Sequence, residues 1–219
     1  MTLGTHGGLA ARLRLMVITD PGLAAPRSVL EVVRAAVEAG APAVQLRNKE
    51  LGARALLEIG RALRTLTQEA GSLFIVNDRL DVAMALGADG VHVGPDDLPV
   101  AAVRSAAPDG FLIGRSADSV DVALQAVQDG VDYIGCGTVY ATTTKADAGD
   151  VIGLEGLDRV AHAVEVPVVA IGGITVPRAL EVAGTHAAGI AVVGAIMAAA
   201  DPGRATMELL AAFAPIVDI

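Results

Sequence analysis

The architecture follows from residues 28–77, SVLEVVRAAVEAGAPAVQLRNKELGARALLEIGRALRTLTQEAGSLFIVN, where segments of helical periodicity alternate with short apolar runs. The segments 28–40 and 53–71 carry their charges on one face and end near a glycine, which is typical of amphipathic helices. The runs 43–47 and 73–77 are apolar at nearly every position, as expected of strands that are covered on both faces. The stretch therefore predicts consecutive strand-and-helix units with parallel strands.

The same rhythm extends over the whole chain. Eight apolar runs are expected to form strands: residues 13–19, 43–47, 73–77, 90–94, 111–115, 132–136, 167–173 and 189–194. Their starts advance by about 25 residues per step, the length of one strand-and-helix unit. Eight such units predict an α/β fold, a single (β/α)8 TIM barrel over residues 1–219, with a doubly wound open sheet as the alternative. Residues 1–12 are expected to form a loose arm.

Composition narrows the classes of partner. The chain of 219 residues has 16 Lys and Arg against 25 Asp and Glu, so its net charge is −9 at pH 7, and it has no Trp. A negative protein with few aromatic side chains is a poor binder of nucleic acid. The single Cys excludes an internal disulfide and suits a reducing compartment, so we expect a cytoplasmic protein. The hydrophobic content of 53% leaves homo-oligomer formation open.

One uncharged run raises the question of a membrane span. Residues 182–200, VAGTHAAGIAVVGAIMAAA, are long enough to cross a bilayer. However, the run contains three Gly, a Thr and His186 and is rich in Ala, which suits a buried strand followed by a turn of small residues. We therefore expect no membrane association.

Polar side chains gather where the expected strands end, which is where a (β/α)8 barrel carries its reacting groups. After the second strand, Gln45, Arg47 and Lys49 alternate along the chain and so share one face. Two cations on one face favour an anionic ligand such as phosphate. A solvated strand end is the alternative.

Carboxylates follow the next two strands. Asn77 and Asp78 end the third strand, and Asp96 and Asp97 follow the fourth. Each could cap a helix, but carboxylates on neighbouring strand ends beside a cationic strand suit Mg²⁺ bound to a diphosphate. The metal site then needs Asp78 and one of Asp96 and Asp97. His92 is equally compatible with a packed strand residue and with a ligand.

Glycine-rich loops follow the later strands. Residues 137–147, GTVYATTTKAD, contain hydroxyl groups and a lysine but lack P-loop spacing, and they suit a phosphate-binding loop. Glycines after the seventh and eighth strands would let backbone N–H groups approach a second phosphate, with tight packing as the alternative. Ser116 could reach the cavity or start a helix, and Cys136 is expected to pack because it lacks a partner base. Two phosphate sites imply a transfer between two anionic substrates.

These motifs together resemble the signatures of the thiamine phosphate synthase family, in order and at matching strand ends. The resemblance covers about residues 14–200 and rests on QLRNK at 45–49, VND at 76–78, HVGPDD at 92–97, IGRS at 113–116, TVYATTTK at 138–145, IGGIT at 171–175 and VVGAI at 192–196. It implies a transferase of thiamine biosynthesis that couples hydroxymethylpyrimidine diphosphate with thiazole phosphate and releases pyrophosphate. The implied mechanism is dissociative: Mg²⁺ assists loss of pyrophosphate, and the thiazole nitrogen captures a pyrimidine methyl cation.

The resemblance also assigns roles to individual residues. Asp78 and Asp97 would hold Mg²⁺. The residues that would contact the two substrates are Gln45, Leu46, Arg47, Asn48, Lys49, Asn77, Ser116, Thr142, Thr143, Thr144, Lys145, Gly173, Val193 and Gly194. The catalytic candidates among them are Arg47, Lys49, Ser116 and Lys145. Pro95 stands where the family usually has Gln, and Ala141 where it usually has Pro, so altered metal affinity is expected.

Three other functions are compatible with the same architecture. A thiazole tautomerase of the same superfamily binds one phosphate and needs no metal, so it should not keep Arg47, Lys49, Asp78, Asp97 and Lys145 together. A non-catalytic barrel that binds thiamine precursors would keep the pocket without turnover. A sugar-phosphate or indole-pathway barrel would need a general acid and base at the strand ends, which the sequence does not supply.

Overall fold

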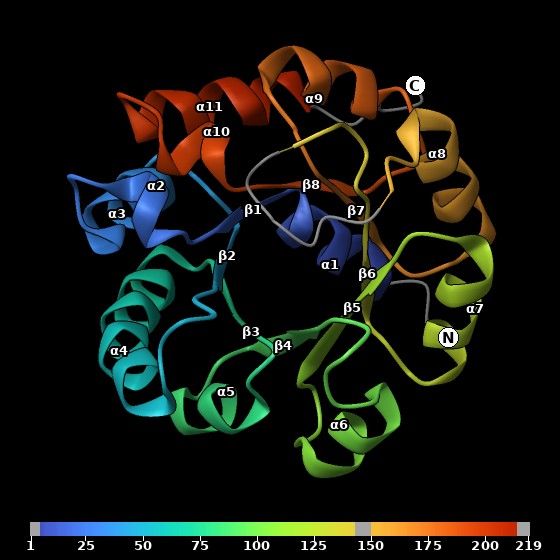
Figure 1. Cartoon of the computed structure of the whole chain (residues 1–219), viewed down its shortest axis with the longest axis horizontal. Helices are drawn as coiled ribbons and strands as arrows, with labels where there is room; N and C mark the ends of the chain where they lie inside the picture. Colours follow the sequence, from blue (N-terminus) through green and yellow to red (C-terminus); the bar gives the residue numbers. More distant parts are fainter. Residues whose placement is uncertain (1–4, 143–149, 214–219) are drawn as a thin grey trace.

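The computed structural model describes residues 5–142 and 150–213. In these residues eight parallel strands form one closed barrel in sequence order (Figure 1). The strands are β1 (Leu15–Ile18), β2 (Ala43–Leu46), β3 (Leu73–Asn77), β4 (Gly90–Val93), β5 (Leu112–Ala117), β6 (Tyr133–Cys136), β7 (Val168–Ile171) and β8 (Gly189–Val192). The prediction of a TIM barrel is confirmed, and the open sheet is excluded because β1 pairs with β8.

Helices surround the barrel (Figure 1). They are α2 (Pro21–Ala24), α3 (Val29–Glu38), α4 (Ala53–Ala70), α5 (Leu80–Leu86), α6 (Val100–Ala106), α7 (Val120–Gln128), α8 (Gly153–Ala163), α9 (Val176–Ala183), α10 (Gly194–Met197) and α11 (Pro202–Ala212). At the start of α3, the Ser28 hydroxyl accepts the Glu31 N–H, and the Glu31 carboxylate accepts the Ser28 N–H. At the end of α4, Gly71 takes a left-handed φ of 71°. The helices expected at 28–40 and 53–71 therefore form with local caps.

Side chains of the strands alternate between two apolar layers. In β1, Leu15 and Val17 pack in the layer between sheet and helices, whereas Met16 and Ile18 belong to a smaller cluster inside the barrel. The inner cluster also contains Leu73 at the start of β3. Because this cluster fills only part of the interior, space remains at the carboxyl ends of the strands.

The prediction of a loose arm over residues 1–12 is wrong for the part of it that the structure describes. An additional helix, α1, covers Thr5–Leu13, while residues 1–4 lie outside the described residues. Leu13 is fully buried, and Leu9 packs against the inner cluster. The helix therefore covers the amino-terminal end of the barrel, where the interior would otherwise expose apolar side chains to water.

Two strand boundaries differ from the expectation in ways that affect the site. β7 ends at Ile171 because Gly172 and Gly173 have φ values of 106° and 63°, which a strand does not use. β5 continues to Ala117, so Ser116 lies within the strand and does not follow it. The run at 182–200 forms the end of α9, then β8 and α10.

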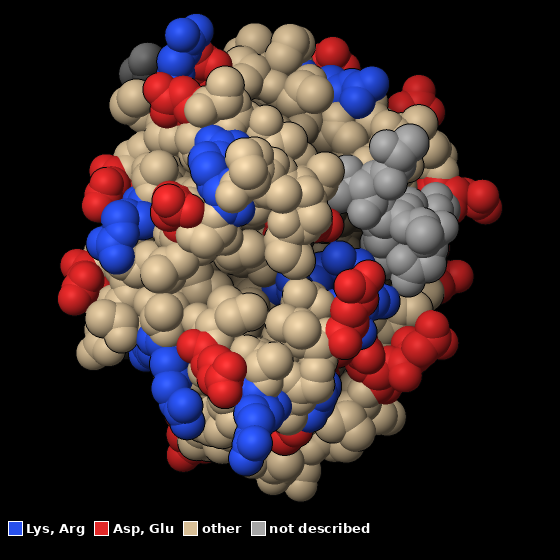
Figure 2. All heavy atoms as spheres, turned by 60° about the vertical axis from the view of Figure 1, so that its left-hand side comes forward, with Lys and Arg blue, Asp and Glu red and all other residues tan. Residues whose placement is uncertain are grey.

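No helix among the described residues has both the length and the apolar character needed to cross a membrane. On the face shown in Figure 2, basic and acidic side chains are interspersed.

Two aspartates stabilise the amino-terminal ends of the strands. The Asp132 carboxylate, just before β6, accepts the Ile113 N–H of β5 at 2.7 Å and pairs with Arg104. Asp89, just before β4, accepts the Phe74 N–H of β3 at the same distance. Each carboxylate thus supplies a partner for a strand N–H that lies beyond the regular ladder.

We expect Asp132→Ala to lower the free energy of unfolding by about 2–3 kcal/mol, because the Ile113 N–H loses its partner and the Arg104 guanidinium keeps only the carbonyls of Gly130 and Phe111. Urea denaturation measures the loss. Asp109→Ala, at an exposed turn, is the matched control and should change stability by less than about 0.5 kcal/mol. Equal effects of the two substitutions would contradict this role of Asp132.

Candidate active site

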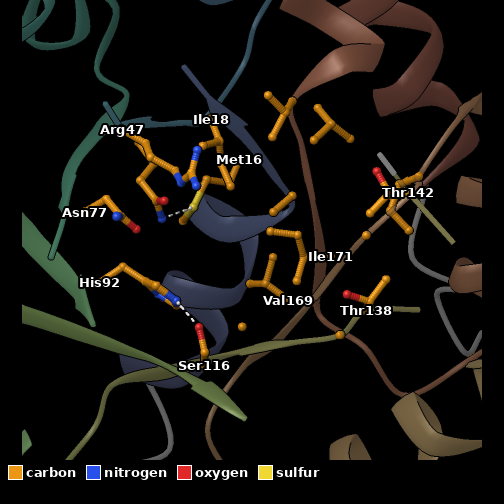
Figure 3. A pocket seen from close by; sticks show the side chains of 18 of the residues that line it. Met16, Ile18, Arg47, Asn77, His92, Ser116, Thr138, Thr142, Val169 and Ile171 are labelled. Atoms are coloured by element: carbon orange, nitrogen blue, oxygen red, sulfur yellow. Dashed lines mark hydrogen bonds between the residues drawn. The ribbon is translucent and has the colours of Figure 1, made fainter. Parts of the chain in front are cut away.

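A cavity of about 730 Å³ opens at the carboxyl ends of the strands. Every strand contributes at least one residue to its lining. Figure 3 shows that polar side chains, Arg47, Asn77, His92 and Ser116, lie apart from the apolar wall that includes Ile171. This is the end of a TIM barrel at which active sites are found.

A pair of carboxylates lies at one edge of the cavity. Asp78 and Asp97 lie beside each other, and both line the cavity. Burial, and next to it the contact with Asp97, raise the pKa of Asp78 to about 6, although Lys49 and Arg47 act in the opposite direction. Carboxylates that share one site in this way favour a proton or a cation between them.

The loop after β4 places both Asp96 and Asp97 along the cavity, and Asp97 is the one that acts on Asp78. The Asp97 carboxylate accepts the Gly94 N–H at 2.6 Å, and the Arg115 guanidinium donates to the Gly94 carbonyl at 3.2 Å. Asp96 and Pro95 are exposed. Of the two carboxylates that the sequence left open, Asp97 is therefore the one that faces Asp78.

The polar face of β2 lies across from the glycine-rich loops. Gln45, Arg47 and Lys49 all line the cavity, as their alternation predicts. Gln45 is buried, whereas Arg47 is half-buried and Lys49 is exposed. The Thr19 hydroxyl donates to the Arg47 carbonyl at 3.0 Å and accepts the Arg47 N–H at 2.8 Å. The backbone that carries the Arg47 side chain is thus held on both sides.

Two residues predicted to bind substrate have side chains outside the cavity. Leu46 is buried in the layer between the sheet and the helices. The Asn48 side chain accepts the N–H groups of Glu50 and Leu51, so it stabilises the turn before α4. The period of two along a strand, which brings Gln45, Arg47 and Lys49 inward, sends these neighbours outward.

A chain of polar side chains crosses the floor of the cavity. The two ring nitrogens of His92 lie 3.1 Å from the Tyr133 hydroxyl and 3.1 Å from the Ser116 hydroxyl, and Figure 3 shows the second contact as a dashed line. Burial raises the pKa of Tyr133, while a hydrogen bond with Gln45 opposes this. Tyr133, on β6, therefore stays neutral and bonds to Gln45 of β2 and His92 of β4, and His92 in turn bonds to Ser116 of β5.

The opposite side of the cavity is built from backbone. Gly172, Gly173, Val193 and Gly194 line it, and Gly194 begins the short helix α10. A Cβ atom on Gly173 would lie 2.9 Å from the Tyr140 carbonyl oxygen, so this glycine is required for packing as well. Tight packing, one of the two alternatives that the sequence left open, therefore applies to Gly173, and backbone access to a ligand stays a prediction.

The loop after β6 contributes Thr138, Ala141 and Thr142 to the same side (Figure 3). Thr143, Thr144 and Lys145, also predicted to bind substrate, lie outside the described residues.

The family model of thiamine monophosphate synthase matches residues 15–196, a range that contains all eight strands. The chain belongs to the thiamine monophosphate synthase family. Thiamine-phosphate synthase of Moorella thermoacetica is 48% identical, over 89% of this chain and 93% of the relative. That of Chloroflexus aurantiacus is 50% identical, over 90% of this chain and 91% of the relative.

A solved structure agrees with this assignment. The thiamine phosphate pyrophosphorylase from Pyrococcus furiosus superposes with a TM-score of 0.87 at 47% identity, covering 94% of this chain and 97% of that one. A 3-hexulose-6-phosphate synthase has a TM-score of 0.67 at 22% identity, covering 92% of this chain and 100% of that one. The second likeness shows the fold alone.

Sequence reasoning did not single out two polar residues that line the cavity, Tyr133 and Arg178. Thr138, which also lines the cavity, lies in the loop at residues 137–147 that the sequence predicts to bind phosphate. Tyr133 had a usable signal: a Cβ atom on Gly114, within β5, would overlap the Tyr133 ring, and one on Gly135 would lie 2.9 Å from the His92 ring. Glycine inside a strand marks a place where another group approaches closely.

We expect Gly114→Ala to destabilise the protein by about 1–3 kcal/mol and to weaken pyrimidine diphosphate binding, because the added methyl group must displace Tyr133. Urea denaturation and titration calorimetry measure the two effects. Gly8→Ala in α1 is the control, since its added methyl group meets no atom within 4 Å and alanine favours a helix. A Gly114→Ala protein as stable as wild type, with unchanged affinity, would show that Tyr133 can move freely.

Proposed function

We propose that this protein is a thiamine phosphate synthase that couples 4-amino-2-methyl-5-hydroxymethylpyrimidine diphosphate with 4-methyl-5-(2-phosphoethyl)thiazole to form thiamine phosphate and pyrophosphate. One observation carries the proposal. A single cavity has two cations and a carboxylate pair, Asp78 with Asp97, on one side and a backbone cradle of glycines on the other. This arrangement suits a metal-bound diphosphate and a second phosphate in one site.

The residues present fit Mg²⁺ as the metal. Asp78 and Asp97 offer carboxylate oxygens that already lie close to each other at the cavity edge. Among the described residues, no cluster of three or more His, Cys, Asp and Glu side chains could hold a metal ion, so water and phosphate oxygens would have to complete its shell. Mg²⁺ binds in this way, through one or two carboxylates together with phosphate groups. When bound, it would neutralise charge on the departing pyrophosphate.

The side chains on the polar side of the cavity bind and orient the pyrimidine diphosphate. Arg47, Lys49 and Asn77 contact the diphosphate, and Gln45 contacts the pyrimidine. Ser116, held by His92, lies near the leaving group. Each of these groups lines the cavity, which makes such contacts sterically accessible.

The backbone cradle orients the second substrate. Gly173, Val193 and Gly194 offer backbone N–H groups to the thiazole phosphate, and Thr142 contributes from the loop after β6. The assignments of Thr143, Thr144 and Lys145 rest on the family resemblance. Holding the thiazole nitrogen beside the pyrimidine carbon lets that nitrogen capture the cation that forms when pyrophosphate leaves.

A dissociative reaction needs no protein nucleophile, and the one cysteine is unsuited to be one. Cys136 is fully buried in the layer between sheet and helices. Burial, and next the charge of Asp118, raise the pKa of its thiol to about 12. The task of the chain is thus to position both substrates and to stabilise separating charge in a cavity shielded from water.

Purified protein with both substrates, with and without Mg²⁺, tests the proposal. We expect thiamine phosphate and pyrophosphate to form in equal amounts, and only with the metal. Isomerisation of the thiazole without pyrophosphate release would indicate a tautomerase instead. Tight binding of either substrate without any product would indicate a non-catalytic barrel.

The proposal includes two further features of the protein. A soluble biosynthetic role with a single buried cysteine suits the cytoplasm. Self-association into a homo-oligomer stays a prediction, which light scattering of the purified protein would test.

A further inference from the structure

A third cation, Arg178, lines the cavity on the side of the glycine cradle. Arg178 comes from the first turn of α9, and it is half-buried. The other two lining cations among the described residues, Arg47 and Lys49, follow β2 and lie beside the carboxylate pair. The positive charge of the cavity wall is therefore divided between two sides.

Arg178 is held in one orientation by two contacts. One terminal nitrogen of its guanidinium donates to the Gly173 carbonyl at 2.6 Å. The guanidinium carbon lies 4.5 Å from the centre of the Tyr140 ring, a cation–π distance. The Tyr140 hydroxyl in turn donates to the Glu181 carboxylate at 2.8 Å, which fixes the ring. Burial, and then Glu181, raise the pKa of Tyr140 to about 12, so the ring stays neutral.

These contacts do not neutralise Arg178. Within the described part of the chain its partners are a carbonyl oxygen and a neutral ring, and Glu181 is engaged by Tyr140. A guanidinium has five N–H donors in a planar fork, and the bond to Gly173 uses one of them. The other donors suit the oxygens of a phosphate, for which this fork is well shaped.

We propose that Arg178 binds the monophosphate of the thiazole substrate and makes the protein select that substrate over its unphosphorylated alcohol. The proposal rests on the proposed function for the identity of the substrate. The glycine cradle supplies only neutral N–H groups, which can donate to a hydroxyl as well as to a phosphate. A fixed cation beside the cradle adds an interaction that the dianion makes and the alcohol cannot.

The test uses Arg178→Gln, which removes the charge but keeps a side-chain donor for the Gly173 carbonyl. Titration calorimetry with the thiazole phosphate should show an increase in Kd of about tenfold or more, as expected for the loss of a charge-assisted hydrogen bond. The Kd for the thiazole alcohol and for the pyrimidine diphosphate should stay within about twofold of wild type. Arg178→Lys should recover part of the affinity, and added salt should narrow the gap between variant and wild type.

Arg159→Gln on α8 is the matched control, because it also removes one positive charge but from an exposed position. Its thiazole phosphate affinity should equal that of wild type. A parallel loss of affinity for the phosphate and the alcohol in Arg178→Gln would overturn the proposal, since Arg178 would then only shape the loop. Binding needs no turnover, so failure of the wild-type protein to form thiamine phosphate would refute the proposed function without altering the outcome of these titrations.

Discussion

Asp78→Asn should reduce the rate of thiamine phosphate formation by on the order of 10³-fold, because the carboxylate pair that would hold Mg²⁺ loses one of its charges. Asparagine has the size of aspartate, and it tolerates the left-handed φ of 61° that Asp78 adopts. The variant should therefore keep its fold. The measurement is kcat at saturating Mg²⁺ and both substrates, with circular dichroism as the test of folding.

The neighbouring carboxylates supply the controls. Asp97→Asn should lower kcat as much as Asp78→Asn does, because the two carboxylates lie close to each other at the cavity edge. Asp96→Asn removes an exposed carboxylate from the same loop and should leave kcat within about twofold of wild type. Wild-type turnover in Asp78→Asn would sink the metal assignment, and a loss in Asp96→Asn equal to that in Asp97→Asn would show that Asp96 also serves the reaction.

Asp78→Asn should also stabilise the metal-free protein. The pKa of Asp78 is raised from 3.8 to about 6, so above that pH its ionised carboxylate lowers stability. Asparagine cannot ionise, and the gain in Tm is therefore full at pH 8. It shrinks as the pH falls below 6 toward 3.8, where the wild-type carboxyl becomes protonated in the unfolded chain as well. Calorimetric scans in EDTA at pH 8 and pH 4.5 measure it; a lower Tm for the variant at pH 8 would show that the ionised Asp78 carboxylate does not destabilise the fold.

The strands and most of the site could be predicted because their signals are local. A strand covered on both faces needs apolar side chains at nearly every position, and each such run became a strand. The inward face of β2 was predictable for a similar reason, since alternation along a strand places Gln45 and Arg47 together without knowledge of any other element. The same rule explains why the side chains of Leu46 and Asn48, which the resemblance assigned to substrate binding, point away from the cavity.

What could not be predicted depends on contacts between distant segments. Residues 5–13 include two adjacent glycines and are too few to form a stable helix alone; α1 is stabilised because Leu9 and Leu13 cover the amino-terminal end of the barrel. The contact between Tyr133 and His92 joins residues 41 apart and is possible only because Gly114 and Gly135 leave room. Arg178 lines the cavity in an orientation that depends on its contact with Tyr140, which lies on a different loop. The glycines within β5 and β6 mark where another side chain approaches, but no local pattern identifies the partner in any of these contacts.

Arg47→Gln should lower kcat by about 10²-fold while raising the KM for the pyrimidine diphosphate by a smaller factor. Arg47 lies close enough to Asp78 to influence its pKa, so it shares the edge of the cavity at which the diphosphate would sit. Charge on the leaving group grows as the bond to carbon breaks. A fixed cation therefore stabilises the transition state more than the bound substrate. Single-turnover release of pyrophosphate, with both substrates saturating, measures the effect.

Whether Arg47→Gln changes mainly kcat or mainly KM shows which role Arg47 has. Arg47→Lys keeps the charge and should recover most of kcat, whereas Arg54→Gln, at an exposed position on α4, should match wild type. A rise in KM with unchanged kcat would mean that Arg47 binds ground state and transition state equally. The stabilisation of separating charge would then fall to other groups in the cavity, with Lys49 first among them. The backbone contacts of Thr19 favour the first outcome, because a cation whose main chain is held on both sides needs little rearrangement as charge develops.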